Sequence, residues 1–152
     1  MIARLTCDQT AMFWPIIRDG IRNDLSLPPA GKHVRRESNI LEALLSGAMD
    51  AWVSYERLEE DGMLRLYYIV LASIYTDSCT KNRSLYLFSI VEYNEGSEET
   101  IREVHDTLIK YAKGANCHTI TGLSNDDKAL AIAKELGADI SFRLVSLDIT
   151  GG

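Results

Sequence analysis

The chain has 152 residues, of which 46% are hydrophobic and 25% are charged, and its formal net charge at pH 7 is −6. This length fits one domain with one core, and the composition excludes a chain that is disordered throughout. An acidic surface repels phosphate backbones, so we expect no nucleic-acid partner.

The first predicted elements are a strand and a helix. Residues 1–5 form a short strand, and Thr6 and Gln9 have the spacing of a capping box that opens a helix. Pro15 lies inside this helix, so we expect it to kink the helix or to shift its start. The apolar residues at helical spacing are Phe13, Ile17, Ile21 and Leu25.

A loop and a second helix are predicted next. Residues 26–38 contain two prolines and a glycine, which is typical of a loop. Asn39 and Glu42 have the form of an N-cap with its returning carboxylate, and Gly47 suits the left-handed position that ends a helix. The side chains that we expect this helix to bury are Leu41, Leu44 and Leu45.

The middle of the chain changes to the period of a strand. Residues 52–57 alternate in polarity, and residues 59–62 carry the turn signal Glu-Glu-Asp-Gly. Residues 63–76 and 84–93 are rich in β-branched and aromatic side chains, with a polar connection between them. We expect these three strands to form an antiparallel meander.

The helical period returns after Gly96. Ser97 can cap a helix that ends at Gly114, with Glu98 and Glu99 in its first turn. A strand over 117–123, a helix over 125–136 and a final strand over 138–150 follow. The predicted order is β-α-α-β-β-β-α-β-α-β, which gives a single α/β domain over residues 1–152 with a mixed sheet and helices on both faces.

This order resembles the fold of the GNAT (Gcn5-related N-acetyltransferase) superfamily over nearly the full chain. The segment from 125 to 138 is similar to the family's pattern of an asparagine, a small residue and a helix that ends in Leu-Gly, with Asn125, Ala129, Leu136 and Gly137 in the matching places. The helix–strand–helix end also resembles small GNAT-like proteins of tailed bacteriophages, which would place the chain in the host cytoplasm or in a virion.

The resemblance implies an acetyl-CoA site between the third meander strand and the next helix. In the family, a loop with Arg or Gln and two small residues holds the pyrophosphate through backbone N–H groups at the helix start. Here Asn94 stands near the Arg or Gln position, Gly96 is retained, and Ser97 and Glu99 fall near the glycine positions. Four carboxylates, at positions 92, 95, 98 and 99, surround this place and repel a phosphate.

A second difference concerns the catalytic acid. Many family members have a tyrosine on the last helix that protonates the leaving thiolate, and here that position is Ala133. We therefore favour a non-catalytic binding or assembly protein, such as a phage morphogenesis or virion component, with no cofactor. The alternative is a divergent acetyl-CoA-dependent N-acetyltransferase that uses Asn94, Gly96, Ser97 and Asn125 for the cofactor and Glu92 as the base.

The segment between the first two helices is the one basic feature of the sequence. In a GNAT layout it borders the acceptor groove, where it could bind an acidic protein partner. A solvated loop with no partner is the simpler interpretation. Its charged residues are Lys32, His33, Arg35 and Arg36.

Several other functions lack support. The three histidines have no HxxxH or CxxC partner, so no metal site is predicted. A nucleic-acid mimic would need its acids clustered, whereas here they are spread along the chain. Cys7, Cys79 and Cys117 do not suggest a disulfide framework, which favours a reducing, cytoplasmic location. We expect neither a signal peptide nor a membrane segment, and the sequence is compatible with a homo-oligomer.

Overall fold

A computed structural model describes residues 1–24, 36–145, 147 and 149. Within these residues, five strands form one sheet in the order β1-β2-β3-β4-β5. The strands are β1 (Ile2–Arg4), β2 (Asp50–Arg57), β3 (Leu64–Thr76), β4 (Arg83–Glu92) and β5 (Thr119–Gly122). Neighbours from β1 to β4 are antiparallel, and β5 runs parallel to β4. The predicted meander and the parallel crossover are therefore confirmed.

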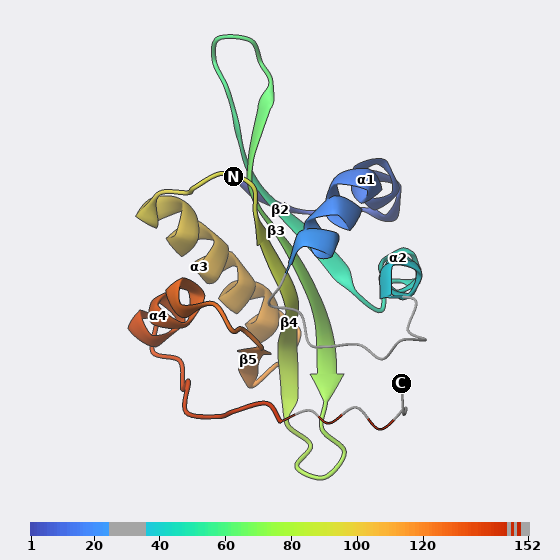
Figure 1. The fold of residues 1–152 in the computed structure, drawn as a ribbon, viewed down its shortest axis with the longest axis vertical. Coiled ribbons are helices and arrows are strands. Elements are labelled where there is room, and N and C mark those ends of the chain that lie inside the picture. The colour runs from blue at the N-terminus through green and yellow to red at the C-terminus, as the bar shows by residue number, and fades with distance from the viewer. Residues whose placement is uncertain (25–35, 146, 148, 150–152) are drawn as a thin grey trace.

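One face of the sheet is covered by α1 (Cys7–Asn23) and α2 (Arg36–Ser46), which lie side by side across the strands (Figure 1). The predicted capping box opens α1, because Thr6 accepts from the Gln9 backbone N–H and Gln9 bonds back to the Thr6 N–H. Pro15 lies inside α1 and does not shift its start. Pro15 is exposed, so water can reach the carbonyl that loses its helical partner.

The second helix differs from its prediction. It begins at Arg36, so Asn39 lies inside it and is not its N-cap. The extra turn carries Glu37, whose carboxylate receives Arg22 Nε at 2.6 Å and Arg22 Nη2 at 2.9 Å, and this contact holds the turn against α1. Ile40 and Leu44 are the buried residues, whereas Leu45 is 45% exposed. Gly47 has φ +80°, as predicted for a helix end.

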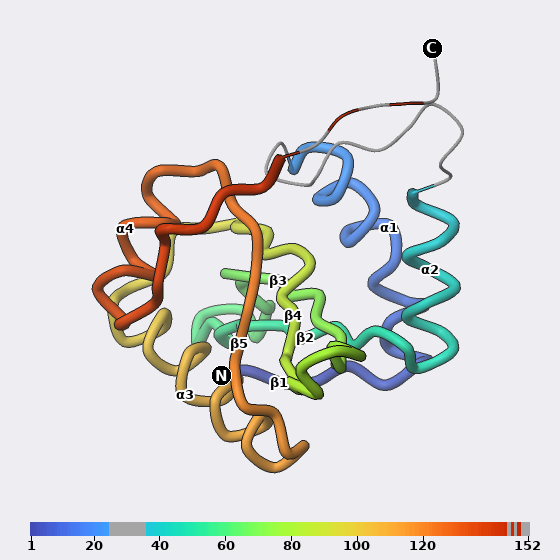
Figure 2. Tube along the Cα trace, turned by 90° about the horizontal axis from the view of Figure 1, so that it is seen from below, coloured from blue at the N-terminus to red at the C-terminus, as the bar shows by residue number. Residues whose placement is uncertain are grey.

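The opposite face is covered by α3 (Glu98–Gly114) and α4 (Asp127–Glu135), and Figure 2 shows the two pairs of helices on either side of the strands. Leu108 and Ala112 of α3 are buried against Trp52, Val70 and Leu85 of the sheet. By contrast, α4 contains no buried residue. Ala129 and Leu136, which fall in the matching places of the family pattern, are exposed.

Polar contacts reinforce the packing of α3. The Tyr111 hydroxyl donates to Asp50 Oδ2 at 3.0 Å, and Arg4 Nη2 contacts Asp50 Oδ1 at 2.9 Å. The Arg4 guanidinium lies 5.3 Å from the centre of the Tyr111 ring, which also meets Trp52 edge to face. This cluster joins β1, β2 and α3.

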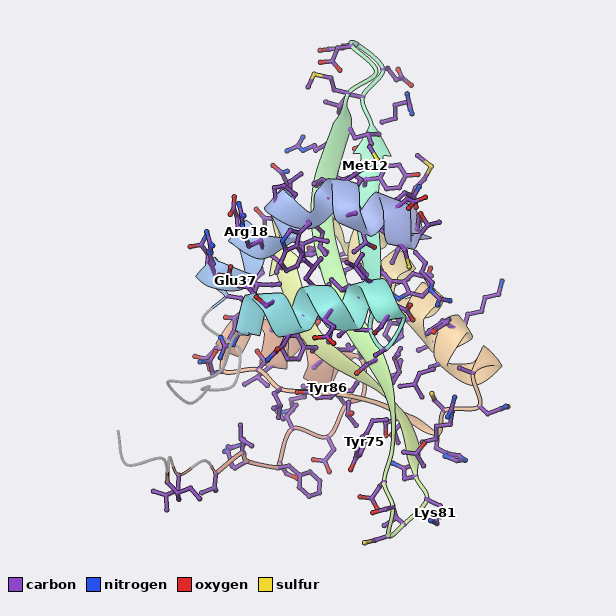
Figure 3. The ribbon with its side chains drawn as sticks, turned by 90° about the vertical axis from the view of Figure 1, so that its right-hand side faces the viewer. Met12, Arg18, Glu37, Tyr75, Lys81 and Tyr86 are labelled. Atoms are coloured by element: carbon purple, nitrogen blue, oxygen red, sulfur yellow. The ribbon has the colours of Figure 1, made fainter. Side chains whose placement is uncertain are left out.

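The predicted final strand over 138–150 is wrong for the residues that the structure describes. Residues 138–145, 147 and 149 are in neither helix nor strand. Alternating apolar residues favour a strand only where a neighbouring strand can pair with them, and none does so here. The segment leaves α4, passes the end of the sheet and extends away from the body of the domain (Figures 1 and 3). In the described part of the chain, no helix is long and apolar enough to cross a membrane.

Candidate functional site

The structure gathers four of the predicted site residues at the point where β4 ends and α3 begins. Glu92 is the last residue of β4, and Asn94 and Gly96 lie in the connection to α3. Ser97 is the N-cap, because its Oγ accepts from the Thr100 backbone N–H at 3.2 Å. The N-terminal end of α3, which carries the positive end of the helix dipole, therefore starts directly beside the end of the strand.

Tyr68 occupies the centre of this site, and the sequence analysis did not identify it. Tyr68 pairs with Glu92 across the β3–β4 hairpin, and its phenol ring and hydroxyl lie against Gly96. A Cβ atom on Gly96 would lie only 2.9 Å from Tyr68 Oη. The phenol therefore fills the space that the absent Gly96 side chain leaves, next to the start of α3.

The surroundings of Tyr68 favour its neutral form. Burial raises the pKa of Tyr68, the Glu92 carboxylate raises it further, and the Gly96 N–H partly lowers it. Glu92 is 44% exposed and also lies 3.9 Å from the Lys128 ammonium of α4. The predicted base is thus half open to solvent, with a neutral phenol and an ammonium group as its neighbours.

The remaining predicted cofactor residues make other contacts. Asn94 donates through Nδ2 to the Leu66 carbonyl at 2.6 Å, which fastens the connection to β3. Asn125 precedes α4, but the N-cap is Asp126, whose carboxylate accepts from the N–H groups of Lys128 and Ala129. Glu98 and Glu99 occupy the first turn of α3, as predicted. These contacts cap helices and close loops.

The sheet opens beside this site. β4 and β5 pair only from Ser84–Thr119 to Leu87–Gly122, whereas β4 continues to Glu92. The β3–β4 register also shifts between Leu71 and Ala72, which leaves Phe88 as a bulge where the pairing with β5 ends. Beyond Leu87, the edge of β4 that faces β5 has no strand partner among the described residues. Its backbone groups are therefore available to an extended ligand.

The predicted basic segment lies largely outside the described residues. Lys32, His33 and Arg35 lie outside the described residues, and Arg36 is the half-buried first residue of α2. Ala133, at the position where the resemblance expects a tyrosine, is half-buried on α4. Among the residues that the structure describes, no group of three His, Cys, Asp or Glu side chains could hold a metal ion.

Two surface depressions lie elsewhere. One has a volume of about 450 Å³ between β2 and the C-terminal half of α3, where Trp52 and Tyr111 line it. The other, of about 310 Å³, lies between β1 and the two N-terminal helices. Neither is lined by a residue of the predicted cofactor site.

Comparisons with known proteins identify the fold. No family model matches the chain, and a search of curated proteins found no match. Solved structures do match over essentially their whole length. A ribosomal-protein-alanine N-acetyltransferase from Brucella melitensis biovar Abortus 2308 shares 14% identity with a TM-score of 0.65, and 98% of this chain and 99% of that chain are covered.

Two further structures agree. A predicted acetyltransferase with acetyl-CoA from Clostridium acetobutylicum has 12% identity and a TM-score of 0.69, covering 100% of this chain and 97% of its own. An aminoglycoside acetyltransferase from an uncultured soil metagenomic sample, in complex with sisomicin, has 13% identity and a TM-score of 0.67, with coverages of 99% and 95%. The chain is therefore a single α+β domain with the GNAT acetyltransferase fold.

Proposed function

We propose that this chain is a divergent acyl-CoA-dependent N-acyltransferase. The observation that carries the proposal is the end of the β4–β5 pairing at Leu87 and Gly122, directly before the N-terminal end of α3. An extended chain with amide groups can pair with the free backbone of β4, and a helix start provides N–H groups for a phosphate. The acetyltransferases of the same fold, one of them solved with acetyl-CoA, support this choice of ligand.

In this proposal Glu92 is the general base. Its carboxylate accepts a proton from the acceptor amine, whose nitrogen attacks the thioester carbonyl. A C–N bond forms, the C–S bond breaks, and the CoA thiolate leaves and takes a proton from solvent. The Lys128 ammonium of α4 lies 3.9 Å from the Glu92 carboxylate, so α4 borders the proposed base.

Tyr68 controls access to the cofactor in the proposed enzyme. Its hydroxyl lies 2.9 Å from the point where a Cβ atom on Gly96 would stand, so a phosphate that binds at this helix start has to displace the phenol. Removing the hydroxyl should open the space beside Gly96 and leave its N–H for the phosphate. Because one hydrogen bond contributes about 0.5–1.5 kcal/mol, we expect Tyr68→Phe to bind CoA roughly 2- to 10-fold more tightly than the wild type.

The proposal is tested by titration calorimetry with CoA and acetyl-CoA. Tyr67→Phe is the matched control. It removes the hydroxyl of the neighbouring tyrosine, which donates to Glu56 Oε2 at 2.6 Å and not to the candidate site. Acyl transfer to a panel of amines should be lost in Glu92→Gln and kept in Glu95→Gln. Absence of CoA binding by both the wild type and Tyr68→Phe would refute the transferase.

One observation favours a second function. The α3 start is already capped by Ser97, its first turn is acidic, and Tyr68 and Asn94 close the connection. If no CoA binds, this arrangement fits a non-catalytic binding or assembly protein on the same scaffold, and an origin in a phage particle stays a prediction. The calorimetric result therefore decides between the two functions.

A further inference from the structure

The C-terminal segment carries apolar side chains that the structure leaves in water. The exposed fractions are 84% for Phe142, 58% for Leu144, 89% for Val145, 83% for Leu147 and 85% for Ile149. We call these five residues the apolar tail. In an extended chain, side chains two residues apart share one side. One side would therefore carry Val145, Leu147 and Ile149, and the other side Phe142 and Leu144. Apolar residues on both sides are typical of a strand whose two faces are covered.

The same molecule has an open strand edge that matches the tail. Within the described residues, β5 is the last strand of the sheet and pairs only with β4. Leu123, which directly follows β5, is 39% exposed. An edge with free backbone groups and apolar side chains nearby is a template for one more strand.

The chain does not place the tail on its own edge. Gly137, with φ +89°, turns the chain out of α4, and Ser141 N–H donates to Asp139 Oδ1 at 2.9 Å in a second local turn. The tail then passes the end of the sheet and leads away from β5 (Figures 1 and 2). Each molecule thus presents a donor segment and an acceptor edge that are not joined to each other.

We propose that two copies of the chain exchange their tails, so that the apolar tail of each extends the sheet of the other along β5. The exchange is isologous, because each copy uses the same donor and the same acceptor, and both unpartnered surfaces are covered in one closed dimer. A second copy supplies both the segment and the edge, so a single contact of one kind covers both surfaces.

The area of the tail fits a dimer of this kind. Burial of one large aliphatic or aromatic side chain removes roughly 60–120 Å² of apolar surface, so five of them remove on the order of 450 Å² per chain. Two tails, together with the surfaces that receive them, then bury on the order of 1,800 Å², which lies within the range of about 1,200–2,000 Å² for stable interfaces.

Light scattering after size exclusion, over a dilution series, tests the exchange. We expect the wild type to have twice the mass of one chain. Val145→Asp combined with Leu147→Asp should give the mass of one chain, with an unchanged circular dichroism spectrum. Met12→Asp is the matched control: Met12 is 79% exposed on α1 (Figure 3), so this variant should remain a dimer. A wild type that is monomeric throughout would refute the proposal.

A cross-linking experiment tests the location of the contact. In a background without the three native cysteines, one tagged chain carries Thr121→Cys in β5 and a differently tagged chain carries Val145→Cys. Oxidation of the mixture should produce a disulfide between the two tags, and Met12→Cys in place of Thr121→Cys should not. A dimer that forms no such disulfide, or that also survives the double aspartate variant, uses another surface and overturns the exchange.

Discussion

Gly20 provides a quantitative test of how α1 packs on the sheet. A Cβ atom at this position would lie 2.5 Å from Tyr93 Oη, 3.0 Å from Val91 Cγ1 and 3.4 Å from Tyr93 Cζ. Tyr93 Oη itself donates to the Ile16 carbonyl at 2.9 Å, so the hydroxyl is held between the helix and β4. Glycine is thus required here by the close approach of one atom.

Two opposing contributions set the change in the free energy of unfolding that we expect for Gly20→Ala. Gly20→Ala gains about 1 kcal/mol of helix propensity. The clash with the Tyr93 hydroxyl costs about 1–3 kcal/mol, as overpacking of a well-packed site usually does. We therefore expect Gly20→Ala to lower the free energy of unfolding by about 1 kcal/mol.

The Tyr93→Phe background should reverse this effect. Without the hydroxyl, the nearest ring atom is 3.4 Å from the new methyl group, which is ordinary contact, and only Val91 has to move slightly. Gly20→Ala should then be neutral or stabilising, with a coupling of about 1–2 kcal/mol in the double-mutant cycle.

Urea denaturation of the four proteins measures this cycle. Gly114→Ala is the control, since nothing lies within 4 Å of a Cβ atom at that helical position, and it should not destabilise the protein. An equal cost of Gly20→Ala in both backgrounds would show that the hydroxyl is not the obstacle.

Three further predictions concern stability. Tyr111→Phe removes the 3.0 Å hydrogen bond to Asp50 and should cost about 1–2 kcal/mol in urea denaturation, and no loss would mean that Asp50 is satisfied by Arg4 alone. Leu108→Ala should cost about 2–5 kcal/mol, because this side chain is only 4% exposed in the core under α3, and a cost below 1 kcal/mol would contradict that packing. Burial raises the pKa of Tyr93 from 10.0 to about 12, so the stability that its proton provides is complete below about pH 10 and is lost as the pH rises toward 12. Melting curves should therefore show the advantage of wild type over Tyr93→Phe shrinking above pH 10, and a constant difference would contradict the shift.

Local patterns in the sequence predicted the elements whose cause is local. The capping box of Thr6 and Gln9, the serine cap of α3 and the left-handed Gly47 each depend on residues within a few positions. The start of α2 was missed because it depends on Arg22, 15 residues from Glu37. The final strand was wrong because alternation describes the faces of a strand and cannot supply its partner.

In the candidate site, too, the sequence predicted only the features that depend on neighbouring residues. Sequence comparison with the GNAT pattern located Glu92, Asn94, Gly96 and Ser97, and the structure brings them to the same turn. Tyr68 was not predicted as a site residue, because its role depends on the register of the β3–β4 hairpin, which places it opposite Glu92. Counting back from the polar connection between the two strands could have suggested this pair, but the bulge at Phe88 moves the register by one residue and defeats the count.

The short β4–β5 pairing has a consequence for local unfolding. Four residue pairs join β5 to the sheet, and the following α4 buries no side chain. We expect this C-terminal part to open well before the meander does, as a separate cooperative unit with fast amide exchange and early proteolytic cleavage after α3. The proposed cofactor site lies between the stable meander and this less stable C-terminal part. A ligand bound there would therefore slow amide exchange throughout β5 and α4.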